Sequence, residues 1–80
     1  MSTKEYYDLI MKGIPSDKMK DLSSYKKELT EEYQKLTEYK QDILKGKHSE
    51  GAIEYIGDLN NEMIIISSTI EAIEYYQKIN

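Results

Sequence analysis

Acidic side chains recur at a fixed spacing in the second half of this 80-residue chain. Glu50, Glu54, Asp58 and Glu62 are each four residues apart, which places them on neighbouring turns along one side of a helix. Like charges at this spacing destabilise a helix by about 0.2–0.5 kcal/mol per pair. Either lysines of a neighbouring helix or an external basic partner would relieve this repulsion. For an external partner, these four acidic residues are the predicted contacts.

Tyrosine is the chain's only aromatic residue type, with eight copies. Its ring packs while its hydroxyl stays in water, which suits both the edge of a helix contact and a binding surface. Tyr6–Tyr7 and Tyr75–Tyr76 are predicted to meet at one end of the molecule. We therefore take Tyr75 and Tyr76 as further candidate partner contacts, with packing at the edge of the core as the alternative.

The one histidine, His48, has no partner for chemistry in the sequence. A metal site would need a second imidazole or a carboxylate cluster, and the chain has no cysteine. An anion site beside Lys45 and Lys47 at a helix N-terminus is conceivable, but a solvated turn is the commoner meaning of such residues. A serine or threonine nucleophile would lack a supporting base. We expect no metal, no cofactor and no enzymatic activity.

Lysines are frequent in the first half of the chain but form no basic stripe. They alternate with acidic residues over 17–40, a pattern typical of a solvated helix face. The net charge is −4, which repels phosphate, so we expect no direct contact with nucleic acid. The lysines predicted to answer the acidic residues of the second half are Lys26, Lys35 and Lys40.

Charge and codon usage bear on partners and origin. Residues 1–47 hold 10 lysines against 9 acidic residues (+1), whereas residues 48–80 hold 1 lysine against 6 (−5). All 11 basic residues are lysine. Lysine, isoleucine and tyrosine have AT-rich codons, which favours an AT-rich bacterial, phage or mobile-element genome, and of these we expect a phage or mobile-element gene. No apolar run reaches the roughly 18 residues of a membrane span, and the first residues lack a signal-peptide pattern. We expect no membrane contact and a cytoplasmic location, in the host if the gene is phage-borne.

Capping residues delimit a short first helix. Ser2 and Glu5 form a capping box, which predicts a helix from about residue 3 to Lys12. Gly13 is predicted to end it in a left-handed conformation. Pro15 cannot continue the helix because it lacks a backbone N–H.

Two long helices are predicted to follow. Ser16 is the expected cap of a helix over about 16–45, with Ser23–Ser24 as a weak point where it could bend or restart. Gly46 ends this helix. A third helix covers about 50–79, which makes residues 1–80 a single all-α domain.

Apolar residues repeat with heptad spacing in both long helices. This repeat predicts a coiled-coil-like seam, and the short connection makes the helices antiparallel neighbours. The expected pairs are Leu36 with Leu59, Leu29 with Ile66 and Leu22 with Ile73, followed by Ile43 with Ile53. In the first long helix, Met19 and Tyr33 share the seam spacing. The predicted fold is a long antiparallel helical hairpin with a short N-terminal helix.

The third helix is apolar on every side. The run Met63–Ile66 must point all round the helix, and such a helix is usually buried all round. One partner helix cannot cover it, and the first helix is short. A second copy is the simplest cover, which predicts a dimeric four-helix bundle. The predicted interface residues are Ile53, Ile64, Ile65, Ala72 and Ile79.

Three non-enzymatic functions fit these features. The first is a small acidic interaction protein that forms a homodimer and inhibits or adapts a host macromolecule, such as a nucleic-acid-handling or defence enzyme, by contacting a basic surface. The second is a structural or assembly scaffold or chaperone. The third is a transcription regulator or antitoxin. Fold alone does not separate them.

Overall fold

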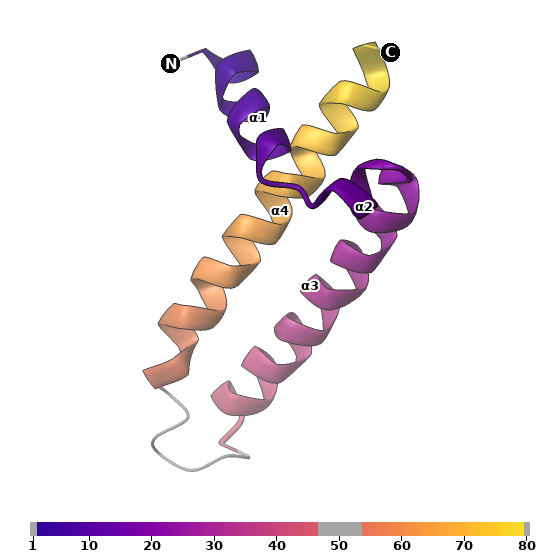
Figure 1. The fold of residues 1–80 in the computed structure, drawn as a ribbon. Coiled ribbons are helices and arrows are strands. Elements are labelled where there is room, and N and C mark those ends of the chain that lie inside the picture. The colour runs from indigo at the N-terminus through magenta and orange to yellow at the C-terminus, as the bar shows by residue number, and fades with distance from the viewer. Residues whose placement is uncertain (1, 47–53, 80) are drawn as a thin grey trace.

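The structure is a computed structural model that describes residues 2–46 and 54–79, and these residues form an all-α fold (Figure 1). The described elements are α1 (Thr3–Lys12), α2 (Ser16–Met19), α3 (Leu22–Leu44) and α4 (Tyr55–Ile79). No strand occurs within these two ranges, so the all-α prediction is confirmed there. None of the helices in the described part of the chain has both the length and the apolar character that crossing a bilayer requires.

The first helix begins and ends as predicted, but its closing residue does not adopt the predicted conformation. The Glu5 backbone N–H donates to Ser2 Oγ at 3.2 Å, so Ser2 caps the helix. Gly13 has φ −82°, which corrects the left-handed prediction. Two backbone hydrogen bonds end the helix instead. The Gly13 N–H donates to the Ile10 carbonyl at 3.0 Å, and the Ile14 N–H donates to the Met11 carbonyl at 3.2 Å.

The predicted helix over 16–45 is divided, which is a correction. Ser16 is the first residue of α2 rather than its cap, because the cap position belongs to Pro15 and carries no side-chain hydrogen bond. Asp21 leaves the helical conformation with φ −145°, and its Oδ1 accepts the Ser24 N–H at 3.0 Å. The break therefore precedes Ser23–Ser24, because the Asp21 carboxylate satisfies a free N–H of a new helix.

The end of α3 agrees with prediction, and the start of the last helix is described in part. Gly46 has φ 77°, a left-handed conformation that glycine adopts without steric cost, and its N–H donates to the Ile43 carbonyl at 3.0 Å. α4 ends at Ile79, as predicted. Residues 47–53 lie outside the described ranges. They include His48, Glu50 and Ile53, so the predictions for these residues are not addressed.

α3 and α4 run side by side in opposite directions, which confirms the antiparallel hairpin (Figure 1). Polar side chains join them at both ends of the contact. Lys40 Nζ donates to Asn60 Oδ1 at 2.7 Å. At the other end, Gln77 Nε2 donates to Ser23 Oγ at 3.0 Å, and Lys26 Nζ donates to Gln77 Oε1 at 3.3 Å.

The core follows the predicted seam. Ile14, Leu29, Ile66 and Ile73 form a buried cluster, against which Leu22, Leu36 and Ile70 pack. Ile14 comes from the connection between α1 and α2, so this turn closes one end of the hairpin core. The other seam prediction in the first long helix was wrong for Met19 and Tyr33, which are exposed.

α1 covers one face of α4 beside the seam. Tyr6 Oη donates to Ser68 Oγ at 3.3 Å, and the rings of Tyr7 and Tyr75 lie 5.1 Å apart. Ser68, Ala72 and Tyr75 are spaced along one helix face, so Ala72 lies between the two points where α1 touches α4. Ala72 is 0% exposed. Its small side chain lets the two helices approach closely.

Candidate functional site

Two of the grooves that border α4 differ in chemistry. The first lies between α3 and the beginning of α4 and has a volume of about 260 Å³. Three carboxylate residues, two tyrosines and two leucines line it. We call it the acidic groove, and its residues are Glu32, Leu36, Tyr39, Tyr55, Asp58, Leu59 and Glu62.

The acidic groove contains two of the predicted partner contacts, Asp58 and Glu62. Both side chains are exposed, and α3 adds a third carboxylate, that of Glu32, from across the hairpin. Glu54 is exposed one turn before Asp58 and extends the same acidic side of the helix. Leu36 and Leu59 line this groove together, in agreement with the predicted pairing of these two residues.

Lysines of α3 do not neutralise these carboxylates. Lys4 pairs with Asp8 at 3.1 Å and Lys18 with Glu28 at 2.9 Å, and neither of these ion pairs involves Asp58 or Glu62. Lys26 and Lys40 do cross the hairpin, but each donates to a side-chain amide oxygen. Lys35 is exposed. Within the described residues, the acidic side of α4 therefore faces solvent without a cation from its own chain.

Among the described residues, the clearly shifted side-chain pKa is that of Lys18. The Glu28 carboxylate accepts a hydrogen bond from Lys18 Nζ and raises the pKa of Lys18 above its ordinary value. Lys18 is in α2 and Glu28 in α3, so this exposed ion pair joins the two helices across the break at Asp21. Because it is exposed, it contributes little to stability.

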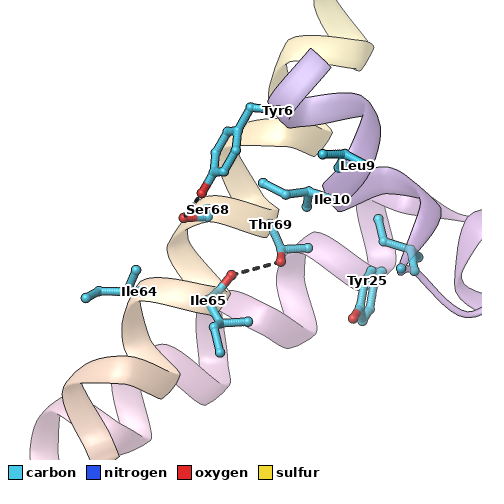
Figure 2. Close-up of a pocket in the computed structure, with 10 residues that line it drawn as sticks. Tyr6, Leu9, Ile10, Tyr25, Ile64, Ile65, Ser68 and Thr69 are labelled. Atoms are coloured by element: carbon cyan, nitrogen blue, oxygen red, sulfur yellow. Dashed lines mark hydrogen bonds between the residues drawn. The ribbon is translucent and has the colours of Figure 1, made fainter. Parts of the chain in front are cut away.

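The second groove lies where α1 meets the middle of α4 and has a volume of about 400 Å³. Figure 2 shows Tyr6, Leu9 and Ile10 of α1 on one side and Ile64 and Ile65 of α4 on the other. No charged side chain lines it. We call it the uncharged groove, and its residues are Tyr6, Leu9, Ile10, Gly13, Ile14, Tyr25, Ile64, Ile65, Ser68 and Thr69.

The predicted dimer residues have different positions in the structure. Ile64 and Ile65 are 61% and 63% exposed and lie in the uncharged groove. Ile79 is also exposed, at the end of α4. Ala72 is a correction, because it is already 0% exposed in a single copy and offers no surface to a second one.

The two predicted tyrosine contacts belong to a packed cluster rather than to the acidic groove. The Tyr75 ring packs against that of Tyr7 at a tilt of 44°, and the Tyr75 and Tyr76 rings are 5.4 Å apart in an edge-on arrangement. The predicted meeting of Tyr6–Tyr7 with Tyr75–Tyr76 is confirmed. Tyr75 follows Glu62 by 13 residues, about 20 Å along a helix, so these tyrosines do not border the acidic residues.

Sequence reasoning missed the groove residues that α3 and α1 supply. Glu32 and Tyr39 flank the seam residue Leu36, at the edge positions of a heptad, where side chains of paired helices meet. This spacing was a usable signal for the acidic groove. Leu9 belongs to the uncharged groove only because α1 folds back over α4, and no spacing within α1 indicates that.

No arrangement for holding a metal ion is present in the part of the chain that the structure describes: among residues 2–46 and 54–79, no three His, Asp or Glu side chains gather closely enough. His48 lies outside these ranges.

No protein family, no curated protein and no solved structure matches the chain. A function for this protein therefore has to come from its own residues.

Proposed function

We propose that this protein is a small acidic interaction protein, not an enzyme, that binds a basic surface of another macromolecule through the acidic groove. The single observation that carries the proposal is that Glu32, Asp58 and Glu62 line one groove with apolar side chains, and no lysine among the described residues forms an ion pair with them. The composition favours a phage or mobile-element gene. The proposed partner is accordingly a host macromolecule, inhibited or adapted in the host cytoplasm.

The groove's chemistry matches a lysine or arginine side chain. The aliphatic stem of such a side chain packs on apolar surface while its charged end stays at the rim. Leu36 and Leu59 offer that apolar surface, and the carboxylates offer hydrogen-bond acceptors for the charged end. Tyr55 adds an aromatic face, which attracts cations. Exposed charges of this kind mainly speed encounter and select partners.

The same features favour binding over catalysis. General acid–base chemistry relies on carboxylates whose surroundings shield them from water and separate their roles. Asp58 and Glu62 are exposed on an open groove. An exposed carboxylate suits recognition of a cation better than transfer of a proton.

We propose further that the working unit is a homodimer. Ile64 and Ile65 expose most of their side chains in a single copy. Leaving an isoleucine in water forfeits about 1.5–3 kcal/mol relative to burying it. A second copy would bury both without adding any new component.

The test uses a short fluorescein-labelled oligolysine peptide as the probe of the acidic groove, with binding measured by fluorescence anisotropy. The wild type should bind it, and binding should weaken as salt rises. The variant Asp58→Asn/Glu62→Gln should bind about tenfold more weakly, because two exposed charge contacts are lost. An oligoglutamate peptide should not bind.

A matched control separates the groove from net charge. Glu71→Gln/Glu74→Gln removes two exposed acidic residues from the same helix and changes the net charge by the same amount. It should weaken binding much less than the groove variant. Equal loss in both variants, or no binding by the wild type at low salt, would refute the acidic groove as the binding site. If the wild type binds and the groove variant does not, a pull-down from the native host with both proteins would identify the partner.

A further inference from the structure

The uncharged groove stands out in a highly charged chain. Charged residues make up 32% of the sequence, yet all ten residues that line this groove are uncharged. Leu9 on α1 is 53% exposed, and Ile64 and Ile65 on α4 are more exposed still. Apolar side chains from two helices are thus gathered at one place without a cover.

We infer that a second copy of this chain docks in the uncharged groove, with α1 as well as α4 in the contact. This inference rests on the homodimer in the proposed function and names its surface. It differs from the interface predicted from sequence, which involved the last helix alone. Leu9 and Tyr6 join the contact, and Ala72 leaves it.

Charge favours a second copy at this place. Each chain carries a net charge of −4, so two copies repel each other wherever their acidic faces meet. The residues that line the uncharged groove carry no charge, so this part of a contact between copies meets no repulsion. A basic foreign partner would gain nothing here, because the groove offers it no carboxylate.

The chain exposes more surface than a compact monomer of its mass, so surface remains for a contact with a second copy. A compact monomer of this mass exposes about 5,000 Å², whereas this chain exposes 5860 Å². The radius of gyration, 15.0 Å, likewise exceeds the roughly 12 Å of a compact chain of this length.

The surface can complement itself. A two-fold interface uses the same patch on both copies, so the patch must carry both a projection and a recess. Ile64 and Ile65 project from α4, and the recess between α1 and α4 lies next to them (Figure 2). The isoleucines of one copy can therefore fill the recess of its partner, which buries apolar surface on both sides.

The experiment is sedimentation equilibrium of the full chain over a range of micromolar concentrations. The wild type should sediment at twice its 9.4 kDa monomer mass. Ile65→Glu should raise the dimer dissociation constant by about 100-fold or more, because it places a charge in an apolar contact. Leu9→Gln should weaken the dimer as well, and it tests the contribution of α1 separately.

Leu44→Glu provides the matched control. Leu44 is 65% exposed on α3 and lies outside the uncharged groove, so this variant should remain dimeric. Circular dichroism should show unchanged helicity in all three variants, since each side chain is exposed in a single copy. If Ile65→Glu lost helicity, its effect on the dimer would not be informative, and the dissociation constant of the Leu9→Gln dimer would test the surface instead.

The outcomes separate this inference from the proposed function. A monomeric wild type would overturn the homodimer and this inference together, while oligolysine binding would still test the acidic groove. A dimer that resists both groove variants, or that Leu44→Glu dissociates equally, would overturn only the assigned surface. A groove occupied by a foreign apolar segment would appear as a monomeric wild type.

Discussion

The two grooves along α4 are built from one helix but differ in every property that matters for binding. The acidic groove uses the first turns of α4, where Asp58 and Glu62 are exposed. The uncharged groove uses the following turns, within residues 63–70, which contain no charged side chain. The comparison teaches that one helix can carry two binding surfaces at different positions along its axis, a charged one in its first turns and an uncharged one in the turns that follow.

The difference also predicts opposite responses to salt. Binding at the acidic groove depends on attraction between exposed charges, which salt screens. Docking of two chains of net charge −4 at the uncharged groove opposes a repulsion, which salt also screens. Rising salt should therefore weaken oligolysine binding and strengthen self-association in the same preparation.

The largest expected effect comes from Ile73→Ala, which should break both grooves together. Ile73 is fully buried in the core cluster that holds α3 against α4. Removing its side chain should lower the free energy of unfolding by about 2–5 kcal/mol. Urea unfolding followed by circular dichroism measures this. A change well below 1 kcal/mol would contradict the core described above.

Ala72→Leu should separate the two grooves. The larger side chain overpacks the contact between α1 and α4 and should cost about 1–3 kcal/mol, measured by the same unfolding experiment. α1 would be displaced, so self-association should fail while oligolysine binding persists. If the variant remained helical but lost both self-association and oligolysine binding, the two grooves would depend on each other.

The charge reversal Glu54→Lys/Asp58→Lys should have the smallest effect on stability and a selective effect on binding. Association with oligolysine should slow and lose its salt dependence, as stopped-flow anisotropy measures. Thermal stability should hold or rise, because like charges on neighbouring turns of α4 are removed. A clear fall in melting temperature would mean that these acidic residues pair with lysines of α3. Self-association should not weaken.

Local pattern was sufficient to predict most of the elements. The bounds of α1 and the C-terminal ends of α3 and α4 agree with prediction. The inward-facing residues Leu29, Ile66 and Ile73 agree as well. Each depends on a cap or on heptad spacing, which are properties of short segments. A bend or restart was predicted at Ser23–Ser24, whereas the break lies at Asp21, because the heptad repeat continues across it and does not mark its position.

The candidate sites were predicted only in part. Asp58 and Glu62 were identified from their spacing, whereas Glu32 and Tyr39 join them only because α3 packs beside α4 in this register. Tyr75 and Tyr76 were assigned to partner contact, but Tyr75 packs against Tyr7 of α1. Exposure depends on what lies opposite a residue, and spacing within one helix carries no information on that.

The sequence by itself determined that the chain forms helices, that two long ones pair along a seam, and that the last has more apolar surface than one partner helix can cover. Only the tertiary structure decided which of those apolar sides α1 covers. The turn at Ile14 buries that residue in the core and directs α1 over Ala72, which leaves Ile64 and Ile65 exposed. The physical reason is that a helix apolar all round has no periodic signal to distinguish a covered face from an open one.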